Sequence, residues 1–137
     1  IGKCSDFHLF ESHFPTKKKL IEDLTSIMEQ TLKSEIFILD SFLNIYSAGS
    51  GVRPHAHISF FDQTHGLVKQ KYSLAYYLSV GDQNCSRPGN LKLHDPDEEL
   101  SLSNGTLVII PSTRKHSSDY GGKLDRVMIG VNFYSLF

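Results

Sequence analysis

Residues 99–110 read ELSLSNGTLVII, two apolar runs joined by Asn104 and Gly105. Leu, Val and Ile at alternating or consecutive positions favour extended strands. Asn-Gly is the pair that a two-residue hairpin turn prefers, because both central residues of that turn need a positive φ. The stretch therefore predicts an antiparallel hairpin and a protein rich in β structure.

The same pattern continues on both sides of this hairpin. Short runs rich in Ile, Val, Phe, Tyr and Leu alternate with turns that contain Gly, Pro, Asn or Asp. We expect strands at residues 36–47, 52–61, 71–80, 90–94, 98–102, 106–111 and 125–135. So many short strands predict a mainly β, α+β protein whose body is a β-sandwich or jelly roll.

A helical pattern precedes the strands. Between Thr16 and Ser34 apolar residues recur at a spacing of three and four, which is typical of a helix with one buried face. They are Leu20, Ile21, Leu24, Ile27, Met28 and Leu32. We expect this N-terminal helix to pack on an outer face of one sheet.

The composition is that of one globular domain. Of the 137 residues, 39% are hydrophobic and 21% are charged, so residues 1–137 are expected to form a single domain with a sizeable core. The net charge of −1 lacks the basic field that nucleic acid or an anionic membrane would require. Cys4 and Cys85 have neither disulfide nor zinc-site spacing, which predicts a soluble protein of a reducing, cytoplasmic compartment.

Residues 52–61, VRPHAHISFF, place His55 and His57 two positions apart. In an extended strand residues i and i+2 point to the same face, so both imidazoles could reach one metal ion. His116 is the best candidate for a third ligand, because it begins the extended segment after a strand and a turn marked by Pro111. Three protein ligands leave positions open on the metal, as a catalytic site requires.

Asp62 is the carboxylate that could replace His57 as a ligand. If the predicted strand is regular, Ser59 and Phe61 follow the histidines on their face and Asp62 points away. We therefore keep His57 as the expected ligand.

Arg126 lies ten residues after His116, on a strand where it shares a face with Met128 and Asn132. If that face lines a cavity, the buried charge needs an anion. Arginine binds carboxylates through two parallel hydrogen bonds, which suits a dicarboxylate. The alternative is an exposed Arg126 paired with a surface acid such as Asp119.

Taken in order, these motifs resemble those of the 2-oxoglutarate- and iron(II)-dependent oxygenases of the prolyl-hydroxylase-like type. The segment YSAGSGVRPHAH (46–57) resembles Tyr-x-x-Gly, five residues and the first metal histidine. The segments YSLAYYLSVGDQNCSRPGNLKLHDP (72–96) and SNGTLVIIPSTRKHSSDYGGKLDRVMIGVNFY (103–134) resemble the strands that follow, with the last histidine and a basic residue ten positions later. The resemblance runs from about Phe42 to the end, and it departs from the usual pattern at His57, where the family has aspartate. A less studied branch is similar in having His-x-His.

The resemblance implies a double-stranded β-helix, which is a cupin-like jelly roll. It implies an Fe(II)- and 2-oxoglutarate-dependent dioxygenase that hydroxylates an unidentified small-molecule or peptide substrate. The residues it implies are His55, His57 and His116 for the metal, and Arg126, Tyr46, Tyr77 and Asn132 for the 2-oxoglutarate pocket.

Two other interpretations stay open. A cupin-like metalloprotein with three histidine ligands would need no 2-oxoglutarate, and Arg126 would then be dispensable. A non-catalytic jelly-roll binding module would carry its histidines incidentally. Metal and 2-oxoglutarate binding would separate all three.

Overall fold

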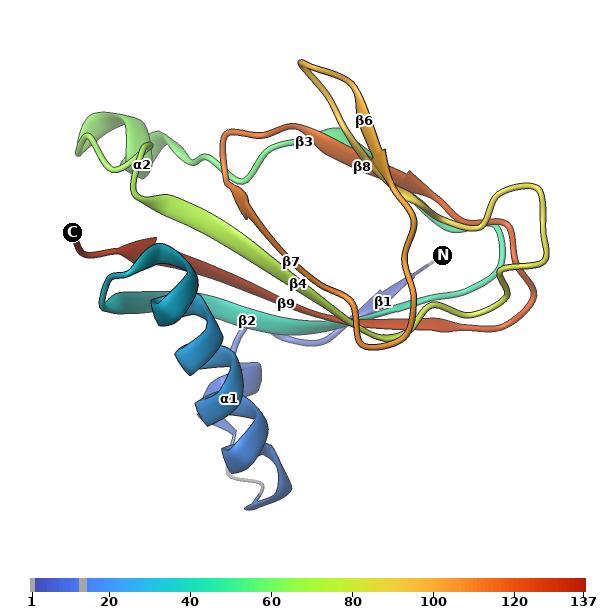
Figure 1. The fold of residues 1–137 in the computed structure, drawn as a ribbon, viewed down its shortest axis with the longest axis horizontal. Coiled ribbons are helices and arrows are strands. Elements are labelled where there is room, and N and C mark those ends of the chain that lie inside the picture. Colours follow the sequence, from blue (N-terminus) through green and yellow to red (C-terminus); the bar gives the residue numbers. More distant parts are fainter. Residues whose placement is uncertain (1, 13–14) are drawn as a thin grey trace.

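The structure, a computed structural model, describes residues 2–12 and 15–137. Two antiparallel sheets face one another, as Figure 1 shows. The strands of the larger sheet are β1 (Lys3–Cys4), β2 (Ile36–Tyr46), β9 (Arg126–Ser135), β4 (Lys71–Ser79) and β7 (Leu107–Pro111), in this spatial order. Those of the smaller sheet are β3 (Gly51–His55), β8 (His116–Asp119), β5 (Leu91–Leu93) and β6 (Glu98–Leu100). This is the predicted mainly β architecture of a double-stranded β-helix.

The predicted helix is confirmed as α1 (Pro15–Leu32), which lies across the outer face of the larger sheet (Figure 1). Its buried Leu24 and Met28 pack against a cluster that includes Val131 and Phe133 of β9. Truncating such a buried leucine to alanine typically costs about 2–5 kcal/mol, so this contact fixes the helix to the sheet. In the two described ranges, no helix combines the length and apolarity needed to cross a membrane.

A second apolar cluster lies between the two sheets. Tyr77 of β4 belongs to the larger sheet, whereas Leu91 and Leu93 of β5 belong to the smaller one, and all three are buried in one cluster with Val80 and Leu102. The sheets are therefore held together at this end by side chains from both layers.

The hairpin predicted at Asn104-Gly105 is wrong. The residues do form a tight turn, in which the Thr106 N–H donates to the Ser103 carbonyl at 3.0 Å and Gly105 has a φ of 86°. However, β6 before the turn pairs with β5, and β7 after it pairs with β4 in the other sheet. The turn carries the chain from one sheet to the other, because a local reversal does not determine which partner each strand finds.

The strand predicted at 52–61 is also too long. Strand β3 ends at His55, and Phe60–Thr64 form the short helix α2. The Ser59 side chain accepts from the Asp62 N–H, and the Asp62 carboxylate accepts from the Ser59 N–H, which is a capping box. The Ser-x-x-Asp spacing in the sequence was the available signal for this helix start.

Candidate metal centre

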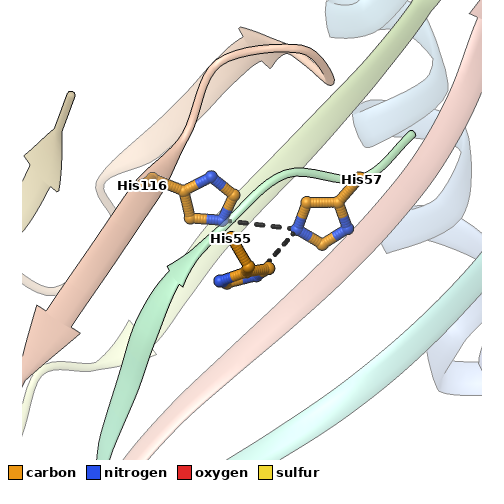
Figure 2. A group of neighbouring side chains, drawn as sticks. All are labelled: His55, His57 and His116. Carbon is orange, nitrogen blue, oxygen red and sulfur yellow. Dashed lines mark hydrogen bonds between the residues drawn. The ribbon is translucent and has the colours of Figure 1, made fainter. Parts of the chain in front are cut away.

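The three predicted metal ligands converge. His55 ends β3, His116 begins β8, and the two residues are paired across these neighbouring strands. The Nε2 atoms of His55 and His57 are 3.1 Å apart, and those of His57 and His116 are 3.3 Å apart (Figure 2). One ligand atom from each ring lies within 4.8 Å of the other two, which is a distance that one metal ion can bridge.

His57 reaches this cluster by a different route from the one predicted. It lies beyond the end of β3, so the two histidines do not share a strand face. Instead the His57 N–H donates to the Ser112 carbonyl at 2.9 Å, and the Ser112 N–H donates to the Lys71 carbonyl at 2.9 Å. The chain thus leaves the smaller sheet after His55 and is anchored to the larger one, which turns the His57 ring toward the other two.

Backbone carbonyls set the tautomers of two of the rings. Nδ1 of His55 lies 2.8 Å from the Arg53 carbonyl, and Nδ1 of His116 lies 3.1 Å from the Arg114 carbonyl. Only an N–H can donate to a carbonyl, so Nδ1 carries the proton and Nε2 is a bare lone pair in both. Lone pairs facing one another repel, and a divalent cation between them relieves that repulsion. The donor set therefore fits a metal ion.

The electrostatics of the cluster favour the neutral imidazoles that metals bind. Burial, followed by the charges of the neighbouring imidazoles and Lys71, lowers the pKa of His57 to about 4. Burial likewise lowers the pKa of His116. Both rings are therefore uncharged at neutral pH without any metal, so a metal would displace no proton from them.

A cavity of about 190 Å³ lies between the sheets, and the histidines form part of its wall. The inner face of β9 forms another part, through Arg126, Met128, Gly130 and Asn132. The condition on which Arg126 was expected to need an anion, that its strand face lines a cavity, is therefore met.

Arg126 is buried, with only 3% of its surface exposed. Its Nη1 donates to the Gly89 carbonyl at 2.7 Å, while its Nε has no hydrogen-bond partner. The guanidinium lies 5.6 Å from the Tyr77 ring centre and 5.0 Å from that of Tyr120. In the described part of the chain no carboxylate pairs with Arg126, and burial lowers its pKa while the tyrosines oppose that shift.

The alternative placement of Arg126 on the surface is wrong. Asp119, its suggested partner, is bonded instead to the exposed Arg87 at 3.1 Å. Sequence patterns did not indicate Tyr120, which is almost fully buried beside the guanidinium, or Gly89, whose carbonyl holds it. The only available signal was the Pro-Gly pair at 88–89, which predicts a turn but not what the turn covers.

The other predicted pocket residues also line the cavity. The Tyr46 hydroxyl accepts from Asn44 Nδ2 at 3.0 Å, and burial raises its pKa. Burial raises the pKa of Tyr77 to about 12. Both phenols are therefore protonated at neutral pH and can donate a hydrogen bond. Asn132 lies six residues from Arg126 on the same face, which separates the two Cα atoms by about 20 Å along the strand.

Asp62 is absent from the histidine cluster, as expected. Its carboxylate is fully buried and bonds to Lys71 Nζ at 2.7 Å and to the Tyr134 hydroxyl. The Asp62 carboxylate is therefore engaged by these bonds and stabilises α2, and it does not act as a metal ligand.

The sequence matches no protein-family model and no curated protein. Solved structures do match. An oxidoreductase of the 2OG-Fe(II) oxygenase family from Burkholderia pseudomallei is similar at a TM-score of 0.66, with 14% identity over 88% of this chain. The viral collagen prolyl hydroxylase from Paramecium Bursaria Chlorella virus-1, as its 2OG complex, is similar at a TM-score of 0.73, with 10% identity over 99% of this chain. A prolyl hydroxylase from Trichoplax adhaerens, in complex with a hypoxia inducible factor peptide fragment, is similar at a TM-score of 0.69, with 13% identity over 98% of this chain.

The chain has the fold of the 2-oxoglutarate- and iron(II)-dependent oxygenases. It spans 57%, 80% and 63% of these three chains in turn, so it covers little more than half of the Burkholderia oxygenase. Within this oxygenase fold, one cavity between the sheets contains both the histidine cluster and Arg126.

Proposed function

We propose that the chain is an Fe(II)- and 2-oxoglutarate-dependent dioxygenase that hydroxylates a small-molecule or peptide substrate. The observation that carries this proposal is the pairing, in one cavity, of three convergent Nε2 atoms with a buried guanidinium that has no carboxylate partner in the described ranges. A buried cation without a counter-ion is costly, so the cavity favours an anionic ligand. A dicarboxylate whose other end reaches the metal satisfies both halves of the site.

The residues have separate roles in this proposal. The three imidazoles would hold Fe(II), and Arg126 would bind the distal carboxylate of 2-oxoglutarate through paired hydrogen bonds. Tyr46 and Tyr77, both protonated, can donate to the same carboxylate. When bound, iron with 2-oxoglutarate supplies dioxygen activation, in which one oxygen atom enters the substrate C–H bond and the other enters succinate as carbon dioxide leaves.

His57 in place of aspartate changes the charge of the site. Two imidazoles and a carboxylate would give Fe(II) with dianionic 2-oxoglutarate a net negative charge, whereas three neutral imidazoles leave that complex neutral. The redox potential and the metal preference should change accordingly. The three-histidine set also suits a cupin-like enzyme that uses no 2-oxoglutarate, so this is the second candidate function.

Anaerobic titration of the Fe(II)-loaded protein with 2-oxoglutarate tests the proposal. We expect stoichiometric binding by calorimetry and a weak visible charge-transfer band from the metal chelate. Arg126→Ala should raise the Kd of 2-oxoglutarate about 100-fold, or about 2.7 kcal/mol, because it removes a charge-assisted bidentate contact from a buried site. Arg87→Ala is the matched control, since Arg87 is exposed and pairs with Asp119 outside the cavity.

The other outcomes identify the alternatives. Metal binding without 2-oxoglutarate binding would favour the cupin-like enzyme. No stoichiometric metal at all would favour a non-catalytic binding module. Equal affinities of the Arg126 and Arg87 variants would contradict the role given to Arg126.

A further inference from the structure

The cavity face of the larger sheet continues outward past the histidines. Asn132 lines the cavity, and Tyr134 follows it on the same face of β9. On β2, Asp40 is paired with Asn132, and Phe37 is paired with Tyr134. Residues opposite one another in adjacent strands share a face, so the Asp40 and Phe37 side chains belong to this surface too. A register shift between Ile38 and Asp40 accounts for their odd spacing.

A chain of hydrogen bonds orients Asp40. Asn132 Nδ2 donates to Asp40 Oδ1 at 2.7 Å, and the Ser73 hydroxyl donates to Asn132 Oδ1 at 2.7 Å. Because that uses the only proton of Ser73, the Ser112 hydroxyl at 3.1 Å must donate to Ser73 Oγ. Ser73, Ser112 and Asn132 are all buried. This chain begins at Ser112, whose carbonyl accepts from the His57 N–H, and ends at the Asp40 carboxylate, which is bonded to Asn132 of the cavity wall.

Asp40 has unused capacity to bind a donor. In the described ranges its Oδ2 has neither a hydrogen bond nor an ion pair. Lys71, which is paired with Tyr134 across the sheet, is already bonded to Asp62. The carboxylate is only partly buried, so a ligand can reach it. A carboxylate in this position attracts a cation, and the neutral complex expected of three histidines, Fe(II) and 2-oxoglutarate would not repel one.

Phe37 adds an apolar surface next to this charge. It is 57% exposed, although its strand partner Tyr134 is 9% exposed. An exposed ring on the face that leads into the cavity offers contact area to the apolar part of a ligand. The ring and the carboxylate lie on one strand, separated by two residues.

We propose that Asp40 and Phe37 form the outer substrate subsite of this cavity, and that the substrate carries an ammonium or guanidinium group beside an apolar segment. The cation is bound by Asp40, and the apolar segment packs on Phe37. The Ser112–Ser73–Asn132 chain holds Asp40 in place. This assignment deepens the proposed oxygenase function and rests on it.

Three probes that share a phenyl ring test the assignment: 2-phenylethylamine, 2-phenylethanol and 3-phenylpropionate. They are titrated by NMR into the Zn(II)-loaded protein with saturating 2-oxoglutarate, so that binding is measured without turnover. We expect the amine to bind about tenfold more tightly than the alcohol, and the carboxylate to bind most weakly. Asp40→Asn should abolish the preference for the amine and leave the affinity of the alcohol unchanged.

Two further variants complete the design. Phe37→Ala should lower the affinity of all three probes alike, by about fivefold, because all three carry the phenyl ring that packs on Phe37. Asp23→Asn is the matched control, since Asp23 is an exposed acid of α1, which packs on the opposite face of the sheet, and should leave every affinity unchanged. Thermal unfolding of each variant shows whether it retains the fold.

The outcomes separate this assignment from the proposed function. Binding of Zn(II) and 2-oxoglutarate without an amine preference, or with a preference that survives in Asp40→Asn, would overturn the subsite and leave the oxygenase proposal standing. Failure to bind Zn(II) or 2-oxoglutarate would overturn the oxygenase proposal itself. Absence of any amine binding would overturn the subsite in either case.

Discussion

Asp62 illustrates how one buried charge supports the site. It has no exposed surface, and its carboxylate accepts from Lys71, Tyr134 and the backbone and side chain of Ser59. Burial opposes its ionisation, but these donors together hold its pKa well below the usual range. Burial, and then the hydrogen bond and charge of the same carboxylate, raise the pKa of Tyr134 to about 12. Asp62 therefore joins α2, β4 and β9 behind His57.

Replacing Asp62 by asparagine should destabilise the fold strongly. The change leaves Lys71 buried without its counter-ion, and breaking a buried pair in this way costs about 3–5 kcal/mol. Urea unfolding measures the loss in free energy of unfolding. Asp23→Asn, at an exposed ion pair of α1, should change it by less than about 1 kcal/mol. A loss below about 1 kcal/mol for Asp62→Asn would contradict the structural role of the pair.

The depressed pKa of Asp62 also predicts how stability depends on pH. The folded protein binds fewer protons at this carboxyl than the unfolded chain, in which the pKa is 3.8. The stabilisation is therefore fully present above about pH 4 and is lost as the pH falls toward the lower folded-state pKa. Urea unfolding of the wild type between pH 6 and pH 3 should show this loss. Lys71→Met, which removes the ammonium group bonded to Asp62, should lose less stability over the same pH interval. An equal loss in the free energy of unfolding between pH 6 and pH 3 would contradict this role of Asp62.

The segment between β4 and β5 lies against the buried side chain of Arg126. Gly89 in this segment has a φ of 81°, and its carbonyl accepts from Arg126 Nη1. A Cβ on Gly89 would overlap the guanidinium. The segment can lie close over Arg126 only because this residue has no side chain.

Gly89→Ala should therefore weaken 2-oxoglutarate binding by displacing Arg126. Gly66→Ala is the matched control, because Gly66 also has a positive φ of 69° but would place its Cβ in open space. Both substitutions should cost about 1 kcal/mol of stability through backbone strain, and Gly89→Ala should cost more than this because of the overlap with Arg126. Only Gly89→Ala should also raise the Kd of 2-oxoglutarate, by about tenfold in calorimetry. Equal Kd values in the two variants would show that Arg126 tolerates the added methyl group.

Across the two sheets, a metal ion would act as a cross-link. His55 and His116 belong to the smaller sheet, whereas His57 is anchored by its backbone to Ser112, which follows β7 of the larger one. A bound ion would tie all three to one point and would bind only the folded chain.

Metal binding should therefore raise the melting temperature. At a free Zn(II) concentration of about 100 times its Kd the stabilisation is about 2.7 kcal/mol, which corresponds to about 8 °C for a domain of this size. A chelator should reverse the increase. His57→Ala should abolish it, whereas His65→Ala, an exposed histidine of the same region, should keep it. An unchanged increase in His57→Ala would remove His57 from the ligand set.

Local patterns were sufficient for the class of fold and for several of its elements. The three-and-four spacing around Leu24 and Met28 predicted α1, and alternation predicted β2, β4, β7 and β9 to within a residue or two. The face of β9 that begins at Arg126 was also predicted from alternation alone. These features depend on residues close together in the chain, which the sequence displays directly.

Which strands and side chains far apart in the sequence contact one another was decided only by tertiary packing. The Asn104-Gly105 turn connects strands of different sheets, because β6 pairs with β5 and β7 pairs with β4. His57 reaches the other histidines through the Ser112 carbonyl, 55 residues away along the chain, after β3 has ended. Arg126 is buried without an acid partner in the described ranges, and Asp119 pairs with the exposed Arg87 instead. Such contacts depend on which surfaces the complete fold brings together, and no local period in the sequence encodes that.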